Sequence, residues 1–494
     1  MKNLSLLTLA LLLSTTLFSQ DKIVKKVTEA VTKTDAEAHL TFLASDDMRG
    51  RDTGSPEIAI AANYIAAQFK LYGVKTVNNA PTYFQEVGLQ QTRPPKKAEV
   101  KLGNDVFTFG KDILVLNGKT SSLTGDFVFA GYGNAEDLAN LDVKGNVVVC
   151  YTGLSEKSTV RQAYRKEAPE KYKLVRDKGA IALVEIYSFT DTPWQMIAGF
   201  LSGTRVMLTD EVSTVEDMPH VWLRKSESET LANLIKQKSA TGSIALETSA
   251  PKNIPGKNVV GVIEGTDPSL KKEYIVLSAH YDHVGVRKNN TPDSIYNGAR
   301  DNGIGTTAIL ESAKFFAQNP TKRSLILVAF TGEEKGLLGS QWYANHPLLP
   351  LNQTVFNLDC DGAGYNDKSI ATLIDLNRTT ADELLKKGCE AFGLGLHGDP
   401  LPGENLYERS DNYNFAVKGV PAVDFGPGVK GMDEELMKYY HQPPDEVASL
   451  DFDYVEKFLR AYVYAAWLVS NSPARPTWKA GDKFEAAGQK LYSK

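Results

Sequence analysis

The sequence predicts an α/β fold with a mostly parallel central sheet flanked by helices, and three observations support this prediction. First, Leu325–Phe330 is an unbroken apolar run, which is typical of a strand buried on both faces of a parallel sheet. Second, similar apolar runs recur in the second half of the chain, at 274–279, 354–358 and 420–425. Third, loops and a helical pattern at 303–318 alternate with these runs, as in parallel sheets covered by helices.

The first residues of the chain have the pattern of a secretory signal peptide. Met1-Lys2-Asn3 precedes an apolar run from Leu4 to Phe18, and Ser19 offers a small-residue cleavage site. The run is too short to span a membrane, and no later apolar stretch is long enough to do so. We therefore expect residues 1–19 to be removed, leaving a secreted or periplasmic protein with no membrane span.

Composition narrows the class of protein further. The net charge of −5 is small and its contributors are mixed along the chain, which gives no support to a nucleic-acid partner. The 494 residues suffice for two or three domains. The three cysteines, Cys150, Cys360 and Cys389, are too few for a disulfide framework.

Shorter patterns describe the region before the predicted sheet. A short helix is expected at 35–44, and a second helix begins after Ser55, with Pro56 in its first turn and Gly73 as its stop. From about Leu123 the pattern changes to short strands and turns, which indicates a second compact domain at about 120–250. Residues 251–256, with two prolines and a glycine, have the composition of its exit linker. Its histidine, His220, has no partner at a useful spacing.

The predicted buried strands end in residues that can bind metal. His280 and Asp359 come directly after two of the runs, and Glu334 closely follows Leu325–Phe330. Ligands of open α/β sheets bind at the carboxyl ends of the strands, where these side chains are expected. Two further candidates, Asp301 and His441, lie in loops.

These five donors suit zinc, because catalytic zinc sites use nitrogen and oxygen ligands and leave one position open. Three carboxylates are too much negative charge for one divalent ion, whereas one bridging carboxylate would let two ions share the site. Asp282, two residues beyond His280, is expected to accept the other imidazole N–H. The side chains of Glu333 and Glu334 diverge, so that one could hold a cation while the other handles a proton.

Each residue also has a purely structural interpretation. Glu333 and Glu334 could simply open the next helix, favoured by its dipole. Asp301 could belong to a turn and helix cap, and Asp359 with Asp361 to a solvated turn. We interpret the remaining histidines as structural: His39, His283, His346 and His397. The metal-site hypothesis is favoured because strand after strand supplies a ligand type at the same edge.

The sequence closely resembles the co-catalytic di-zinc aminopeptidase family, which consists of secreted exopeptidases with an α/β core. The resemblance is to the version of this family that carries a protease-associated (PA) domain. The resemblance rests on SAHYDHVG (278–285), NGARDNGIG (297–305), FTGEEKGLLGS (330–340), NLD (357–359) and YHQPPD (440–445). Leu43–Arg51 also resembles the family's N-terminal segment. The resemblance implies a discontinuous peptidase domain at 21–119 and 252–475, a PA insert at 120–251 and a C-terminal tail at 476–494.

The resemblance also implies roles for the site residues. Two Zn²⁺ per chain are expected, with Asp301 bridging both ions. His280 and Asp359 would bind one ion, and Glu334 and His441 the other. Glu333 would be the general base that takes a proton from the attacking water and passes it to the leaving amine, and Tyr440 would stabilise the oxyanion.

The sequence departs from the family pattern at Cys360, where Met is frequent, at Ile304, where Ser is common, and at Gln442, where Thr is usual. None of the three is a predicted ligand. The stretch 409–411 (Arg-Ser-Asp) has two interpretations: it lines the substrate pocket, or Ser410 or Asp411 caps the helix expected at 412–417.

The main functional prediction is an exopeptidase that removes N-terminal residues from a peptide substrate. A carboxypeptidase or dipeptidase on the same di-zinc site is the first alternative, with Arg409 or Arg300 placed for a substrate carboxylate. Related glutaminyl cyclases work with one zinc, and the five-ligand set argues against them. A non-catalytic receptor-like binding protein is a more distant alternative, against which Glu333 and the intact ligands argue. The PA domain could make a protein contact of its own.

Overall fold

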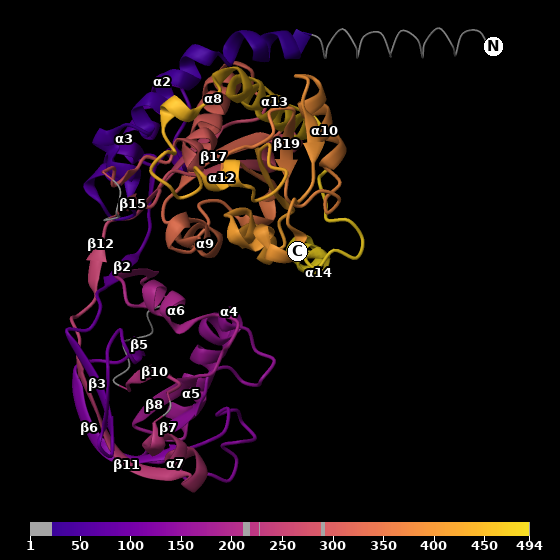
Figure 1. Ribbon diagram of the computed structural model, residues 1–494. Coiled ribbons are helices and arrows are strands. Elements are labelled where there is room, and N and C mark those ends of the chain that lie inside the picture. Colours follow the sequence, from indigo (N-terminus) through magenta and orange to yellow (C-terminus); the bar gives the residue numbers. More distant parts are fainter. Residues whose placement is uncertain (1–21, 211–217, 227, 288–291, 494) are drawn as a thin grey trace. The chain divides into compact units, whose positions relative to one another are not determined.

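The computed structural model describes residues 22–210, 218–226, 228–287 and 292–493, which form two compact units. Unit 1 comprises the described chain up to Val87 and again from Pro255 onward, and unit 2 comprises Gly88–Ile254 (Figure 1). The second unit thus begins earlier in the chain than the insert expected at 120–251. The expected signal peptide lies outside the described residues. Within the described ranges, no helix has both the length and the hydropathy needed to cross a membrane.

The core of unit 1 is a mixed eight-stranded sheet in the order β1-β13-β17-β14-β18-β21-β19-β20. Its four central strands, β17, β14, β18 and β21, run parallel to one another, and antiparallel neighbours flank them on both sides. This confirms the predicted α/β fold with a mixed sheet, in which four of the seven strand pairings are parallel. The strands are β1 (Phe84–Glu86), β13 (Lys257–Ile263), β14 (Tyr274–His280), β17 (Ser324–Phe330), β18 (Thr354–Asp359), β19 (Ile370–Leu373), β20 (Gly395–His397) and β21 (Ala422–Pro427).

The apolar run 325–330 has its physical explanation in the two cores that cover this sheet. Leu325, Leu327 and Ala329 belong to one hydrophobic cluster, whereas the alternating residues 326, 328 and 330 belong to another. Because both faces of β17 are buried, every position along it must be apolar. The strand therefore lacks the polar alternation of a half-exposed strand.

Helices supply the other side of each cluster (Figure 1). The larger cluster includes residues of α2 (Lys33–Leu43), α3 (Pro56–Tyr72), α8 (Ile304–Gln318), α10 (Asp382–Glu390) and α13 (Phe452–Asn471). The smaller cluster includes residues of α9 (Leu338–Asn345), α11 (Asn412–Val417) and α14 (Glu485–Tyr492). Helix α12 (Glu434–Met437) lies in the segment before His441.

Helix α3 illustrates how closely local sequence fixes an element. The Ser55 hydroxyl accepts a hydrogen bond from the backbone N–H of Ile58, which satisfies one of the free donors at the helix start. Gly73 ends the helix with φ of 84°, a left-handed conformation that favours glycine. The predicted start and stop of this helix are both confirmed.

Unit 2 contains an eight-stranded mixed sheet in the order β4-β3-β11-β6-β7-β8-β10-β5, with a separate three-stranded sheet, β12-β2-β9. The larger sheet comprises β3 (Lys97–Leu102), β4 (Asp105–Thr108), β5 (Ile113–Asn117), β6 (Ser121–Phe129), β7 (Val147–Tyr151), β8 (Ala182–Tyr187), β10 (His220–Arg224) and β11 (Ser239–Glu247). The smaller sheet comprises β2 (Leu89–Thr92), β9 (Arg205–Leu208) and β12 (Lys252–Ile254). The helices are α4 (Val160–Gln162), α5 (Ala168–Asp177), α6 (Trp194–Leu201) and α7 (Glu229–Gln237).

A buried polar network lies inside unit 2 and corrects one expectation. His220, which was expected to lack a partner, has its Nε2 atom 2.6 Å from a carboxylate oxygen of Glu185. The other oxygen of Glu185 accepts a hydrogen bond of 2.6 Å from the Lys171 ammonium group, and the Trp222 indole N–H donates to the first oxygen. The three side chains of Lys171, Glu185 and His220 satisfy one another, so we interpret the network as structural.

Candidate metal centre

The parallel register of unit 1 brings the predicted ligands to one edge of the sheet. His280 is the last residue of β14 and lies opposite Phe330, the last residue of β17. On the other side of β14, Ser278 lies opposite Asp359, the last residue of β18. The three strands therefore end side by side, and their following residues project into the same region.

Glu333 and Glu334 occupy a short turn rather than the start of a long helix. Gly332 has φ of 72°, which reverses the chain after β17, and a 3₁₀ turn follows over Glu333–Lys335. Helix α9 begins only at Leu338. The alternative interpretation, in which the two glutamates merely open this helix, is therefore wrong.

Asp301 lies between two histidines. One carboxylate oxygen is 3.4 Å from Nε2 of His280, and the other is 3.1 Å from Nε2 of His441. Asp301 precedes α8 in an irregular turn that begins at Gly298, with φ of 65°. A carboxylate that faces one histidine with each oxygen has the arrangement expected of a bridge between two cations.

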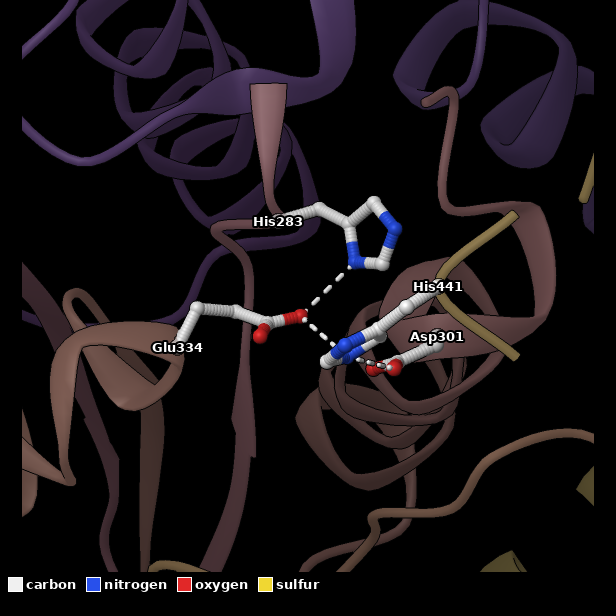
Figure 2. A group of neighbouring side chains, drawn as sticks. All are labelled: His283, Asp301, Glu334 and His441. Carbon is white, nitrogen blue, oxygen red and sulfur yellow. Dashed lines mark ion pairs between the residues drawn. The ribbon is translucent and has the colours of Figure 1, made fainter. Parts of the chain in front are cut away.

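A first group of donors surrounds one side of Asp301 (Figure 2). It consists of His283, Asp301, Glu334 and His441, each of which offers one ligand atom within 4.8 Å of the others. Oε1 of Glu334 lies 2.9 Å from Nδ1 of His283 and 3.2 Å from Nε2 of His441. His283, which the sequence analysis interpreted as structural, is thus placed among the predicted ligands.

A second group lies on the other side of Asp301 and consists of His280, Asp301 and Asp361. Nε2 of His280 is 3.1 Å from Oδ1 of Asp361. It is also 3.9 Å from Oε2 of Glu333, which belongs to neither group. Glu333 therefore lies beside the cluster, as a proton-transferring group would, while Glu334 lies within it.

Asp359 is close to the second group but is not part of it. Its carboxylate accepts hydrogen bonds from the Ser278 hydroxyl at 2.5 Å and from the Ser410 hydroxyl at 2.9 Å. The Ser410 hydroxyl also lies 2.6 Å from Oδ2 of Asp361, so that it links the two carboxylates. The ligand role of Asp359 stays a prediction, and Asp361 is a donor that the sequence analysis did not propose.

Asp282 stabilises both the turn that carries Glu333 and Glu334 and the loop after β14. Its carboxylate accepts hydrogen bonds from the Thr53 hydroxyl at 2.8 Å and from the backbone N–H groups of Glu333 and Glu334 at 3.1 and 3.3 Å. Nδ1 of His280 lies 3.1 Å from the Asp282 backbone carbonyl and 3.9 Å from its carboxylate. The predicted support of His280 thus comes chiefly from the Asp282 backbone, and the carboxylate orients the two glutamates.

A buried arginine joins the loops that carry the donors, and sequence analysis did not single it out. The guanidinium of Arg51 donates to the backbone carbonyls of Tyr281, Asn297 and Gly298 at 2.8, 2.7 and 2.9 Å. Burial lowers the pKa of Arg51 to about 10, although the carboxylates of Asp445 and Asp282 oppose the shift. At neutral pH the side chain stays charged, which offsets part of the negative charge of the site.

The pKa values of the two neighbouring glutamates are shifted in opposite directions. Burial raises the pKa of Glu333 well above its ordinary value. His280 acts to lower this pKa, but nearby carboxylates add to the increase. Burial and Asp301 also act to raise the pKa of Glu334, but the imidazoles of His283 and His441 outweigh them and lower it to about 2. Glu333 is thus suited to hold a proton, and Glu334 to remain a carboxylate.

The histidines experience the same crowding of negative charge. Burial acts to lower the pKa of His441, but Asp301 and Glu334 outweigh burial and raise it to about 10. The pKa of His280 is raised in the same way by Asp361 and Glu333, against the effect of burial. The cluster therefore attracts positive charge, and a divalent cation supplies more of it than the protons it would displace.

The rim of the site contains Tyr440 and Arg409. The ring of Tyr440 lies 4.2 Å from that of His441, measured between centroids, and its hydroxyl lies 3.4 Å from Nη2 of the exposed Arg409. Arg300, in contrast, is buried and donates to the backbone carbonyls of Tyr365 and Ser449. Of the two arginines considered for a substrate carboxylate, Arg409 is the accessible one.

Asp411 occupies the N-cap position of α11, but its side chain does not cap the helix. The Asp411 side chain makes no capping hydrogen bond to α11, and its carboxylate accepts a hydrogen bond from the Ser340 hydroxyl instead. Ser410 binds the two aspartates described above. Asp411 thus has the position that the capping interpretation expects but not the capping hydrogen bond, and the alternative, that the stretch lines the pocket, stays a prediction.

The chemistry of the donors fits divalent zinc. Imidazole nitrogens and carboxylate oxygens are its usual protein ligands together with thiolates. Oε1 of Glu334 and both ring nitrogens of His283 are buried and make no hydrogen bond within the described part of the chain. Buried polar atoms without such partners are rare and are expected where an ion completes the site. The fold and the site together indicate a metal-dependent α/β protein.

Comparisons with known proteins assign the class more closely. Residues 258–466 match the model of Peptidase family M28, and this segment contains all the predicted ligands. The chain is 26% identical to Aminopeptidase YwaD of Bacillus subtilis (strain 168), over 98% of this chain and 99% of that protein. These matches support an enzyme of the metallo-aminopeptidase type, and residues 258–466 are similar to peptidase family M28.

Two solved structures have a similar fold. An aminopeptidase from Aneurinibacillus sp. strain AM-1 aligns with a TM-score of 0.60 at 21% identity, covering 93% of this chain and 98% of that one. BSAP, a zinc aminopeptidase from Bacillus subtilis, aligns with a TM-score of 0.50 at 19% identity, covering 90% and 97%. At this level of identity the likeness concerns the fold, and it extends over both units.

Proposed function

We propose that the chain is a secreted or periplasmic di-zinc aminopeptidase that removes single residues from the amino end of peptides. The observation that carries the proposal is the pair of donor groups that share Asp301, with Glu333 beside them. Two groups with a shared carboxylate can hold two cations, and a pair of zinc ions would lower the pKa of water towards neutrality and polarise the scissile carbonyl. The aminopeptidase names of YwaD and of the zinc enzyme BSAP support the same activity.

The protein's own groups then divide the remaining work. Glu333, whose Oε2 lies 3.9 Å from Nε2 of His280, takes a proton from the attacking water and delivers it to the leaving amine. Asp282 keeps Glu333 in place through the backbone N–H of the turn. The Tyr440 hydroxyl, at the rim beside His441, donates to the developing oxyanion.

The amino-terminal specificity follows from the charge of the site. Carboxylates of Asp301, Glu333, Glu334 and Asp361 gather within a largely buried region. A free α-amine of the substrate is cationic at neutral pH, and Glu333, which belongs to neither donor group and so would not be neutralised by zinc, can accept a hydrogen bond from it. A blocked amine would leave the acidic groups without that partner.

A carboxypeptidase is the second candidate, because Arg409 is exposed and lies 3.4 Å from the Tyr440 hydroxyl. An arginine placed next to the reacting carbonyl could bind the terminal carboxylate of a substrate in a bidentate manner. The two candidates differ in which end of the peptide must be free.

A set of three tripeptides of the same sequence separates them: one with both ends free, one N-acetylated and one C-amidated. For an aminopeptidase, N-acetylation should lower kcat/KM by roughly 10²-fold or more, as loss of one partner of a buried charge pair costs about 2–5 kcal/mol. Amidation should have little effect. The reverse pattern, abolished by Arg409→Gln, would establish the carboxypeptidase instead.

We further propose that unit 2 corresponds to a PA insert and that it contributes a protein contact rather than a catalytic group. Within the described residues, neither metal-type group includes a residue of unit 2. Its buried polar network, Lys171–Glu185–His220, is internally satisfied.

A further inference from the structure

His283 is the most unusual histidine of the site. Its side chain is fully buried, and within the described residues neither ring nitrogen makes a hydrogen bond. Nδ1 nevertheless points to Oε1 of Glu334 at 2.9 Å, and the ring meets that of His441 edge-on at 5.4 Å between centroids (Figure 2). A buried imidazole without hydrogen bonds is costly, so a partner for Nδ1 is expected.

The distances within this group resemble those between ligands of one ion. Oε1 of Glu334 lies 2.9 and 3.2 Å from two imidazole nitrogens, and it still makes no hydrogen bond to any residue that the structure describes. Zinc ligands at about 2.0–2.1 Å from the ion lie roughly 3.3 Å from one another in a tetrahedron. Side chains that converge at this spacing, but are not aligned to donate to one another, are arranged to face a common cation.

We propose that His283 is a direct donor to the cation held by Asp301, Glu334 and His441. The inference rests on the proposed metal-dependent function and adds a ligand to it. With His283, this position has four protein donors among the described residues, whereas the position formed by His280, Asp301 and Asp361 has three; Asp359, which accepts hydrogen bonds from Ser278 and Ser410, is not one of them.

The two positions are then unequal in a way that serves the reaction. Four protein donors hold a cation tightly, as in structural sites, whereas three leave a place open for water or substrate. Glu333 lies next to the three-donor position, 3.9 Å from His280. The four-donor position would therefore retain its ion first, and the three-donor position, with Glu333 beside it, would leave a place open for water or substrate.

Cobalt substitution tests the donor count directly. In protein loaded with Co²⁺, each ring N–H of a directly bound histidine gives a strongly shifted, solvent-exchangeable proton resonance. We expect three such resonances in the native sequence, from His280, His283 and His441, and the loss of one in His283→Ala. Two resonances in the native protein, unchanged in the variant, would overturn the inference while leaving a di-metal enzyme intact. A protein that binds no cobalt or zinc would overturn the proposed function as well.

Zinc titration tests the consequence for affinity. The native protein should bind two Zn²⁺ in steps of different affinity, and His283→Ala should weaken the tighter step by at least roughly 10-fold while sparing the weaker one. Asp361→Asn should weaken the weaker step and spare the tighter one. The cobalt-loaded variant should still show three shifted histidine resonances. His39→Gln, a change at another buried histidine, serves as the control and should leave both steps unchanged.

Affinity alone does not separate a ligand from a residue that only orients Glu334, because such residues also change affinity 10–100-fold. The resonance count makes this distinction. If His283→Ala fails to fold, the count in the native protein and the milder variant His283→Asn decide the question. Equal zinc affinity in the native protein and in a folded His283 variant would contradict the inference.

Discussion

At the residue scale, the site separates two adjacent glutamates by their surroundings rather than by their chemistry. Glu334 lies among the donors at 2.9 and 3.2 Å from two imidazoles, and its pKa is lowered to about 2. Glu333 lies outside both groups, and burial raises its pKa. One turn after β17 thus provides both a permanent carboxylate and a group that can hold a proton.

This separation predicts different failures for two conservative variants. Glu333→Gln removes a base but no donor, so zinc content should persist while kcat falls by roughly 10²–10⁴. Glu334→Gln removes a donor, so zinc content should fall together with activity. Elemental analysis of purified protein and turnover of a free tripeptide measure the two effects. Loss of zinc in Glu333→Gln with full zinc in Glu334→Gln would reverse the assignment.

The residue scale is also where the sequence was least informative. His280 was found because it ends a strand, but His283 follows in an irregular loop, where no periodicity fixes the direction of a side chain. Asp361 carried a usable signal, since it lies two residues after Asp359 in an extended stretch and such residues share a side. The sequence carried no comparable signal for Arg51, because these hydrogen-bond partners are backbone carbonyls distant in the sequence.

At the element scale, the sequence predicted the central strands of unit 1 because each is buried on both faces. The strands β14, β17 and β18 have apolar runs that leave little choice of structure. The early strands of unit 2 are different: along β3 and β4, buried residues alternate with charged or exposed ones, and each strand is short. The alternation along β3 is itself the pattern of a half-buried strand, so the sequence carried a signal for this part of unit 2 that the boundary expected at 120 did not use.

Helix α8 contains a buried acid that the proposed reaction does not use. The side chain of Glu311 is fully buried, and neither carboxylate oxygen makes a hydrogen bond within the described residues. Its neighbours are Nε2 of His39 at 3.8 Å and Nζ of Lys314 at 3.9 Å. Burial raises the pKa of Glu311 to about 8, against the effect of Lys314, and burial lowers the pKa of His39 to about 4.

This acid predicts how the stability of unit 1 depends on pH. The folded state binds the Glu311 proton more tightly than the unfolded state, so its stabilising contribution is present below about pH 4.5 and is lost as the pH rises through 8. The pKa shift of His39 has the opposite sign. Its contribution to stability no longer changes above pH 6.5, the ordinary pKa of histidine. Between pH 6.5 and 8, Glu311→Gln should therefore become increasingly more stable than the native protein, by up to a few kcal/mol.

Urea unfolding at pH 6.5 and pH 8 measures the difference, with the exposed Glu383→Gln as a matched control that should show no such trend. A constant difference between Glu311→Gln and the native protein across this range would show that Glu311 does not titrate there.

At the scale of the whole molecule, the two units have separate hydrophobic cores. The clusters of unit 1 draw on residues before Val87 and after Pro255, and the clusters of unit 2 draw only on the segment between them. All residues of the two donor groups belong to unit 1. A ligand that binds only the native state stabilises the unit that holds it, by about 2.7 kcal/mol at a free concentration of 100 times Kd.

Calorimetry should therefore resolve two unfolding transitions, of which zinc shifts only one. Chelation should lower the midpoint of the unit 1 transition by several degrees and leave that of unit 2 in place, because only the first contains the ion. Ile186→Ala, which opens a cavity in the core of β8, should lower the other transition alone, since burial of this side chain contributes about 2–5 kcal/mol. Asp301→Asn should make the first transition insensitive to zinc. If chelation and Ile186→Ala both moved one common transition, the two cores would unfold as a single cooperative unit, contrary to this prediction.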